Sequence, residues 1–249
     1  MSALVYGLVP ARSGSKGLPN KNILPIDGIP LLAYSIAFGR RLGLDQVIVS
    51  TDSDEYAAIG RQYGGLCPYL RGEAASSDTA MEEDILADLS ANLPRHGVAL
   101  PTIWVRLKPT TPFRSLDNAR KAIEILLARP EVDSVRHVTR SETRLQTINN
   151  DGFLQPLSSD WPAGRSVIRR TEFPVAYQVF NLDVLRHKNF ETLGPGYMGK
   201  RSIPIIGEAI TGMDIDNRDG FEVVKALIEA RPRPDVVSRH LVVPEQASG

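Results

Sequence analysis

Apolar segments of strand length alternate with segments of helical spacing along most of the chain. The first of them, Ala3 to Val9, is mostly apolar and ends at Pro10, which is typical of a strand buried on both faces. We predict further strands at 46–49, 102–107, 133–138, 176–180 and near 203–206, and helices at 31–42, 55–63, 78–89, 116–127 and 219–230. This order predicts an α/β domain with a mostly parallel central sheet and helices on both faces.

The regular pattern is interrupted between residues 141 and 172. Asn149 to Gly152 is a strong turn signal, and prolines and arginines crowd the rest of this stretch. We therefore expect one domain over residues 1–231 with a small excursion from the sheet at 141–172. Residues 232–249 are expected to form a C-terminal tail.

Charge and composition exclude several classes of protein. The chain has 29 basic and 29 acidic residues, so it lacks the net positive field that would hold nucleic acid or an anionic membrane. No apolar run approaches the roughly 20 residues needed to span a bilayer, and the N-terminus does not have the layout of a signal peptide. The single cysteine, Cys67, cannot form an internal disulfide and is expected in the core. We expect a cytoplasmic protein whose partners are neither nucleic acid nor membrane.

The loop after the first strand, from Ala11 to Asn22, combines cations with glycines. Ligands of open α/β sheets collect at the carboxyl ends of strands, where this loop is expected to lie. Arg12, Lys16 and Lys21 can neutralise phosphate oxygens, and Gly14 and Gly17 allow backbone N–H groups to approach an anion closely. The spacing fits neither the Walker loop nor the dinucleotide fingerprint. The loop predicts a triphosphate site, although a solvated basic connection has the same composition.

Two aspartates near the C-terminus, Asp214 and Asp216, flank Ile215 in a stretch expected to be extended. Residues two apart on an extended chain point to the same side, so both carboxylates can share one cation. Hard oxygen ligands beside a triphosphate favour Mg²⁺. Alternatively, one or both aspartates cap the final helix. Asp52 after the second strand is equally suited to capping a helix, so we leave it outside the expected site.

The segment Val9 to Asn22 closely resembles the signature loop of the acylneuraminate cytidylyltransferases, the CMP-sialic acid synthetases. The resemblance continues in the same order through 49–52, Arg71, 77–80, 108–114 and 213–216. It implies a Rossmann-like three-layer nucleotidyltransferase fold of the glycosyltransferase-A-like kind. It also implies that CMP is transferred from CTP to the anomeric hydroxyl of a 2-keto-3-deoxy sugar acid, with release of pyrophosphate.

The resemblance assigns roles to particular residues. Catalytic roles fall on Arg12, Lys21, Asp214 and Asp216, and the last two are assigned to Mg²⁺. Nucleotide contacts fall on Ala11, Arg12, Ser13, Gly14, Ser15, Lys16, Gly17, Lys21, Asn22, Arg71, Ser77, Asp78, Thr79 and Ala80.

The acceptor side departs from the family pattern. Lys108 stands where sialic acid synthetases usually have glutamine, and residues 173–176 lack the arginine and asparagine usual there. We therefore expect a sialic-acid-like nonulosonate or another 2-keto-3-deoxy sugar acid as the acceptor. Its expected ligands are Lys108, Thr110, Arg165 and Arg170, although the two arginines could equally belong to a solvated or subunit-contacting strip.

By the same resemblance, the excursion at 141–172 reaches a partner subunit, so a homodimer is expected. Its anchors would be Phe153, Leu154, Leu157 and Trp161, unless these side chains cover the sheet edge instead. Three other functions stay open at this point. They are transfer from another NTP to a sugar phosphate, nucleotide binding without catalysis, and glycosyl transfer from a nucleotide sugar.

Overall fold

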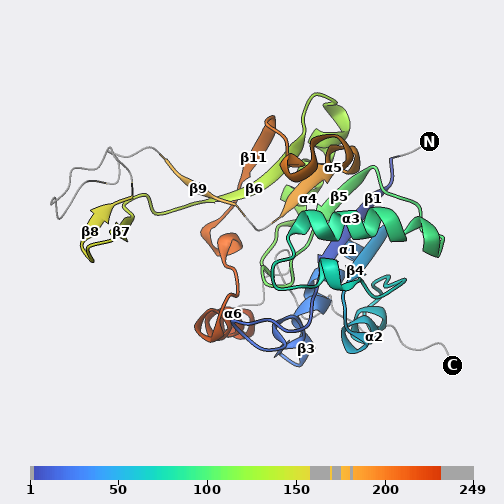
Figure 1. The fold of residues 1–249 in the computed structure, drawn as a ribbon, viewed down its shortest axis with the longest axis horizontal. Coiled ribbons are helices and arrows are strands. Elements are labelled where there is room, and N and C mark those ends of the chain that lie inside the picture. The colour runs from blue at the N-terminus through green and yellow to red at the C-terminus, as the bar shows by residue number, and fades with distance from the viewer. Residues whose placement is uncertain (1–2, 158–168, 170–174, 180–181, 231–249) are drawn as a thin grey trace.

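A computed structural model describes residues 3–157, 169, 175–179 and 182–230, and its centre is a seven-stranded sheet (Figure 1). The strand order is β11-β6-β10-β5-β1-β4, and β9 pairs with β6 outside this path. These strands are β1 (Val5–Pro10), β4 (Gln46–Ser50), β5 (Ile103–Arg106), β6 (Ser134–Arg140), β9 (Tyr177–Gln178), β10 (Asp183–Arg186) and β11 (Ser202–Ile206).

Parallel ladders join β1 to β4, β1 to β5, and β11 to β6, as expected for strand–helix–strand units. The apolar run that forms β1 is buried because the strand lies between β5 and β4 with helices on both sides. Strand β10 was not predicted. It lies between β5 and β6 and is antiparallel to both.

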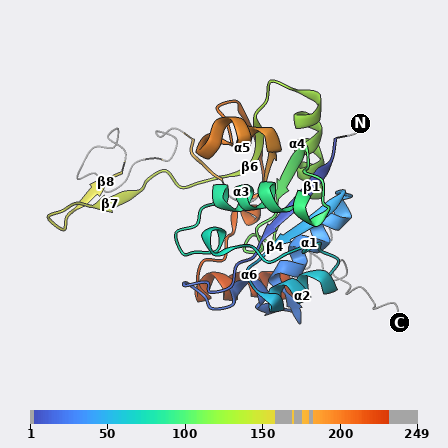
Figure 2. The same cartoon turned by 45° about the vertical axis from the view of Figure 1, so that its right-hand side comes forward.

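Six helices occur in the part of the chain that the structure describes. They are α1 (Leu31–Leu42), α2 (Asp54–Gln62), α3 (Glu82–Asn92), α4 (Leu116–Ala128), α5 (His187–Leu193) and α6 (Arg218–Ala230). Helices α1, α2 and α4 pack on one face of the sheet in one apolar cluster, and α3 packs on the other face around Trp104 (Figure 2). The three predicted layers are therefore present, and Cys67 is buried in the first cluster as expected.

Helix α3 begins at Glu82, four residues later than predicted. The backbone N–H of Met81 donates to Asp84 Oδ2 at 2.7 Å, which caps the helix at this point. The preceding carbonyls of Ser76 and Ser77 face Arg12 instead of entering a helix. The residues before α3 consequently form a loop that meets the first loop.

A third apolar cluster ties the first loop to the C-terminal end of the domain. Leu18 and Ile26 pack with Ile215 and with Phe221 of α6. Between the loop and α1 the chain makes a tight hairpin of β2 (Pro25–Ile26) and β3 (Ile29–Pro30). The 3-10 helices of the described chain are Lys21–Ile23, Glu73–Ala75, Pro94–His96, Gly194–Gly196 and Ala209–Gly212. The cluster brings segments from both ends of the domain to one side of the sheet.

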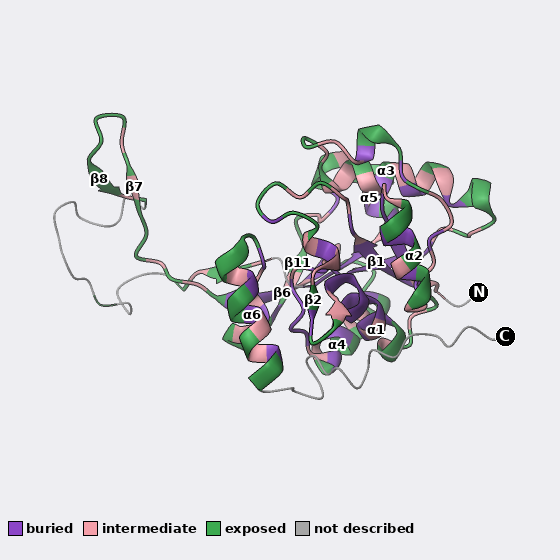
Figure 3. Ribbon diagram, turned by 90° about the horizontal axis from the view of Figure 1, so that it is seen from below, coloured by how far each residue is buried: buried purple, intermediate pink, exposed green. Residues whose placement is uncertain are grey.

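The predicted excursion contains a small hairpin of β7 (Gln146–Ile148) and β8 (Leu154–Pro156). The predicted turn at 149–152 is confirmed, since Asn149 Oδ1 accepts hydrogen bonds from the N–H groups of Asp151 and Phe153. Figures 1 and 3 show the hairpin projecting away from the body of the domain, with most of its surface exposed. Within the described residues, no helix has the length and apolar character needed to cross a bilayer.

Candidate active site

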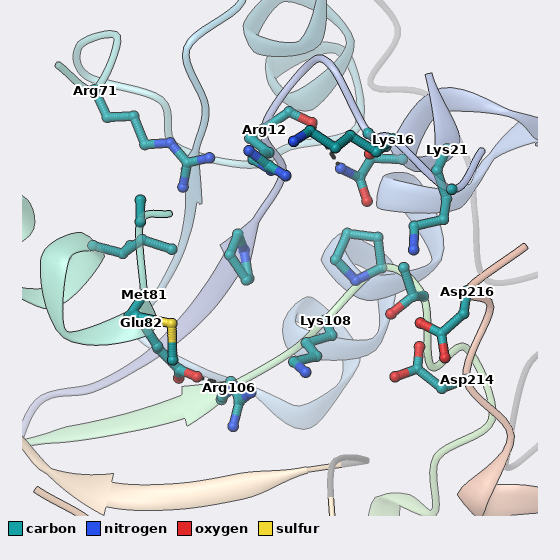
Figure 4. Close-up of a pocket in the computed structure, with 18 residues that line it drawn as sticks. Arg12, Lys16, Lys21, Arg71, Met81, Glu82, Arg106, Lys108, Asp214 and Asp216 are labelled. Atoms are coloured by element: carbon teal, nitrogen blue, oxygen red, sulfur yellow. Dashed lines mark hydrogen bonds and ion pairs between the residues drawn. The ribbon is translucent and has the colours of Figure 1, made fainter. Parts of the chain in front are cut away.

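A cavity of about 680 Å³ opens where β1 and β5 end and their following loops begin (Figure 4). Its walls come from the first loop, the segment from Arg71 to Ile85, residues 106–110 and the Asp214–Asp216 segment. Parallel strands place their carboxyl ends at one edge of a sheet, so the topology gathers these distant segments.

The first loop is held by contacts along its own length. Ala11 is buried, and its N–H donates to the carbonyl of Ser50 at 2.9 Å. The N–H and Oγ of Ser13 donate to the two carboxylate oxygens of Asp52 at 2.7 and 2.9 Å. Asn22 Nδ2 donates to the carbonyl of Arg12 at 3.0 Å, so the loop is shaped before any anion enters.

Asp52 therefore fixes the loop rather than capping the next helix. The cap of α2 is Ser53, whose Oγ accepts from the N–H of Tyr56 at 3.4 Å. A Ser-Thr-Asp turn before a helix fits a helix cap equally well, so the local sequence does not reveal this contact of Asp52. The structure places its carboxylate against the first loop, at Ser13.

Two cations of the loop share one carboxylate. Arg12 Nη1 lies 3.0 Å from Asp78 Oδ1, and Lys16 Nζ lies 2.8 Å from Asp78 Oδ2. These hydrogen bonds, from Lys16 and then from Arg12, lower the pKa of Asp78. Asp78 is expected among the nucleotide contacts, and in the structure its carboxylate pairs with both loop cations.

Two contacts join the first loop to the aspartate pair. Lys21 Nζ donates to the carbonyl of Ile215 at 2.7 Å. Gly17 lies so close to Asp216 that a Cβ added at this glycine would stand 2.5 Å from the Asp216 carbonyl oxygen. The Ile215 N–H in turn donates to the carbonyl of Thr110 at 2.9 Å, which ties the pair to the loop after β5.

Asp214 and Asp216 both line the cavity, and Figure 4 shows their carboxylates pointing into it, while Ile215 between them is fully buried. Asp214 Oδ1 is buried and accepts no hydrogen bond from any residue that the structure describes. Helix α6 is capped by Asn217, whose Oδ1 accepts from the N–H of Gly220 at 2.9 Å, so the capping alternative does not apply to the aspartates. A buried carboxylate oxygen without a donor suits a hard cation.

These two carboxylates would hold a metal together with ligands from a substrate. In the described residues, no group of three or more His, Cys, Asp and Glu side chains is arranged to hold an ion. A triphosphate beside the pair could supply the missing oxygen ligands.

Arg71 lies at the end of the cavity opposite the aspartate pair (Figure 4), and Pro10 and Ala80 also line the cavity. The side chain is buried, its Nε donates to Ser76 Oγ at 3.2 Å, and its Nη1 has no hydrogen-bond partner among the described residues. Burial lowers the pKa of Arg71, although the guanidinium stays charged. Arg71 Nη1 could therefore donate a hydrogen bond to a polar atom of a ligand bound at this end of the cavity.

A network of ion pairs forms another part of the cavity wall, at Glu82 and Arg106. It was not predicted from the sequence. Arg106 Nη2 lies 2.8 Å from Glu82 Oε2, and Arg106 Nη1 lies 2.6 Å from Asp183 Oδ2. Arg136 Nε lies 2.9 Å from the other oxygen of Asp183. The sequence signal for this network was the arginine that ends the otherwise apolar strand Ile-Trp-Val-Arg. A buried charge needs partners of opposite charge, so this arginine predicts acidic residues next to the strand.

The turn after β5 carries Lys108 and Thr110 into the cavity. It is held from below by Arg114, which is fully buried and whose Nη2 donates to the Lys108 carbonyl and to Thr111 Oγ1. Burial, followed by the charge of Arg106, lowers the pKa of Lys108.

Most predicted site residues meet in this one cavity. Those lining it are Arg12, Ser15, Lys16, Gly17, Lys21, Asn22, Arg71, Ala80, Lys108, Thr110, Asp214 and Asp216. Ala11, Ser13, Gly14, Ser77, Asp78 and Thr79 are not among the lining residues and lie in the same two loops. Arg165 and Arg170 lie outside the described residues. The lining residues missed from the sequence include Met81, Glu82, Ile85 and Arg106.

Comparisons with known proteins agree with this arrangement. A model of the cytidylyltransferase family matches residues 6–198. An N-acylneuraminate cytidylyltransferase of Escherichia coli is 29% identical over 240 residues, which are 95% of this chain and 55% of that protein. A CMP-N,N'-diacetyllegionaminic acid synthase of Legionella pneumophila is 32% identical over 152 residues, which are 60% of this chain and 65% of that protein. This chain thus spans less than two thirds of either relative.

The fold has solved counterparts. The structure of a CMP:2-keto-3-deoxy-manno-octonic acid synthetase complexed with CTP aligns with a TM-score of 0.65 at 16% identity, over 92% of this chain and 99% of that one. The Rossmann-like three-layer fold predicted from the sequence is confirmed.

Proposed function

The chain belongs to the cytidylyltransferase family, and we propose that it transfers CMP from CTP to the anomeric hydroxyl of a 2-keto-3-deoxy sugar acid, releasing pyrophosphate. One observation carries the proposal. The cationic first loop and the aspartate pair, far apart in sequence, line the same cavity and are joined through Lys21 and Ile215. A nucleoside triphosphate needs both cations and a metal-binding carboxylate set.

In this reaction the anomeric hydroxyl attacks the α-phosphorus of CTP, and the bond to the β-phosphate breaks. Arg12, Lys16 and Lys21 would neutralise the phosphate oxygens and the departing pyrophosphate. Positioning and charge stabilisation account for most of the catalysis expected of such a site.

We propose Asp214 and Asp216 as ligands of Mg²⁺, supported by the buried Oδ1 of Asp214, which has no hydrogen-bond partner within the described parts of the chain. When bound, the ion would stabilise negative charge on phosphate oxygens. Lys21 would keep the first loop against the aspartate segment through its bond to Ile215, so that the phosphates and the carboxylates face each other.

We propose that the nucleoside of CTP binds at the end of the cavity lined by Arg71 and Ala80. The resemblance to the acylneuraminate cytidylyltransferases implies base and ribose contacts at these residues. For the acceptor we propose the end of the cavity at Lys108 and Thr110, next to the aspartates. The relatives named above act on nonulosonic acids according to their names. The exact sugar acid used by this chain stays open to assay, and a cytoplasmic location stays a prediction.

We also propose a homodimer formed through the β7–β8 hairpin. Ile148, Phe153 and Leu154 are 68%, 70% and 71% exposed, so they do not cover the sheet edge in this chain. An exposed apolar cluster on a projecting hairpin is typical of a subunit contact. Light scattering should give a dimer for the wild type and a monomer for a Phe153→Ser, Leu154→Ser variant, and a wild-type monomer would contradict the proposal.

The function is tested by measuring pyrophosphate release with each of the four NTPs and a panel of sugar acids. The panel comprises N-acetylneuraminic, N,N'-diacetyllegionaminic, pseudaminic and 2-keto-3-deoxy-manno-octonic acids. We expect release with CTP to be at least about tenfold faster than with any other NTP, and only when an acid is present. Preference for another NTP, or CTP binding without turnover on any acid, would replace this function by one of its alternatives.

A further inference from the structure

The start of α3 forms an apolar part of the cavity wall. Met81 directly precedes the helix, Ile85 lies one turn further along, and both side chains line the cavity. Ile85 also packs against the apolar cluster around Trp104, whereas Met81 is 62% exposed. An apolar surface inside a cavity favours a ligand that presents an apolar group to it.

Polar contacts hold this part of the wall next to the end of β5. The N–H of Met81 donates to Asp84 Oδ2 at 2.7 Å, which fixes the backbone where the helix begins. The next residue, Glu82, pairs with Arg106 at 2.8 Å, and Arg106 pairs with the buried Asp183 at 2.6 Å. The apolar surface therefore adjoins an ion pair that is anchored in the sheet.

The phosphate-binding groups proposed above lie elsewhere in the cavity. Figure 4 shows Met81 and Glu82 next to Arg106, across the cavity from Lys16 and Lys21. A triphosphate held by the first loop would leave the wall at the start of α3 uncovered. The acceptor is the remaining substrate, and its proposed position is on the turn that follows Arg106, so it can reach this wall.

We propose that Met81 and Ile85, beside the ion pair of Glu82 and Arg106, receive an acylamino substituent of the acceptor. The enzyme would then select acylamino sugar acids over acids that carry only hydroxyl groups. An acylamino group joins an alkyl group to a polar amide, which matches an apolar surface that adjoins an ion pair. A hydroxyl group at the same place would leave Met81 in contact with water. The inference rests on the proposed function and names the class of acceptor.

The test compares each acylamino acid of the panel with the matched analogue that has hydroxyl groups in place of its acylamino groups. For each compound, kcat/KM is measured by pyrophosphate release from the full chain at saturating CTP. The variants are Met81→Ala, which shortens the apolar side chain, and Met81→Leu, which keeps its volume. Leu193→Ala is the control, because Leu193 is an exposed apolar residue of α5 outside the cavity lining.

For the wild type we expect kcat/KM to be at least about tenfold higher for one acylamino acid than for its hydroxyl analogue. Met81→Ala should lower this ratio by about threefold or more, in line with the loss of a methylene-sized apolar contact. Met81→Leu should keep most of the ratio, and Leu193→Ala should leave it unchanged. The KM for CTP should stay within about twofold in all four proteins.

A ratio that Met81→Ala leaves unchanged would overturn the inference, as would a wild type that prefers the hydroxyl analogues. If Met81 instead contacts the nucleoside, the KM for CTP will rise in Met81→Ala and the ratio will not change. Failure of the proposed function has a different signature, namely that CTP releases no pyrophosphate with any acid, acylamino or hydroxyl.

Discussion

Lys21 Nζ donates a 2.7 Å hydrogen bond to the carbonyl of Ile215, a residue 194 positions later in the chain. Because Ile215 lies between Asp214 and Asp216, this bond couples the cationic loop to the proposed metal ligands. The proposed triphosphate site is therefore built jointly by the two ends of the domain.

Replacing Lys21 by alanine removes a proposed phosphate ligand and this bond together. We expect kcat/KM for CTP to fall by about a hundredfold or more, as is usual when one electrostatic stabiliser is lost. The apolar packing of Leu18 and Ile26 on Ile215 remains, so the melting temperature should change little. Lys121→Ala on α4 is the matched control, and a wild-type rate in Lys21→Ala would refute the assignment.

Asp214→Asn tests the proposed metal site, because it removes the charge of the side chain and leaves its shape almost unchanged. Pyrophosphate release should drop by about a hundredfold or more and should respond weakly to added Mg²⁺. The free energy of unfolding should change little, because none of the described residues donates a hydrogen bond to the buried Oδ1 that loses its charge. Asp219→Asn, at an exposed position of α6, is the control. Unaltered Mg²⁺ dependence in Asp214→Asn would remove this residue from the site.

Gly17→Ala tests the close approach of the loop to the aspartate segment. The new Cβ would stand 2.5 Å from the carbonyl oxygen of Asp216, so one of the two segments must move. We expect the KM for CTP to rise about tenfold or more and the protein to lose about 1–3 kcal/mol of unfolding free energy, as for other overpacked sites. Gly196→Ala is the control, because its new Cβ would have open space around it, and it should change neither the KM for CTP nor the free energy of unfolding. Wild-type kinetics in Gly17→Ala would show that the two segments need not touch.

Local patterns were sufficient to predict most of the fold. The helix expected at 31–42 is found at Leu31–Leu42, since helical spacing and the preceding proline mark it clearly. The strand β10 was missed because Asp183–Arg186 is four residues long and begins and ends with a charge. Its charges are tolerated through contacts with Arg106, Arg136 and the carbonyls near α4, which belong to other parts of the chain. Such long-range compensation leaves no local sequence pattern.

The candidate site was predictable to a similar extent. Its loop and its aspartates were found because each forms a compact motif. The contacts that hold that loop could not be predicted, because Ser13 and Asp52 are 39 positions apart in the sequence and Arg12 and Asp78 are 66 positions apart. Pairing of this kind depends on which strand ends meet, and the sheet order decides that.

Asp78→Asn tests whether Asp78 competes with phosphate for the loop cations. Arg12 and Lys16 contact its carboxylate at 3.0 and 2.8 Å, and a triphosphate would need the same two groups. The variant should bind CTP about two- to fivefold more tightly, in line with the small energies of exposed ion pairs, and should bind CMP unchanged because CMP lacks the β- and γ-phosphates. If Asp78 instead contacts the base or ribose, both nucleotides will bind more weakly, and fluorescence or calorimetric titration separates these outcomes.

Two buried histidines give the stability of the protein a defined dependence on pH. His137 and His187 are 3% and 6% exposed, and burial lowers the pKa of each below the ordinary value of 6.5. Below pH 6.5 the unfolded chain therefore binds protons that the folded chain does not, so the free energy of unfolding should fall as the pH decreases from 6.5. Urea unfolding between pH 7.5 and 5.5 measures this slope. His137→Leu should make this slope shallower whatever its effect at pH 7.5, because leucine binds no proton in either state. In the described structure neither ring nitrogen of His137 has a hydrogen-bond partner that the substitution would remove. His96→Gln, at an exposed position, should keep the wild-type slope, and an equal slope in His137→Leu would mean that His137 can be protonated in the folded state.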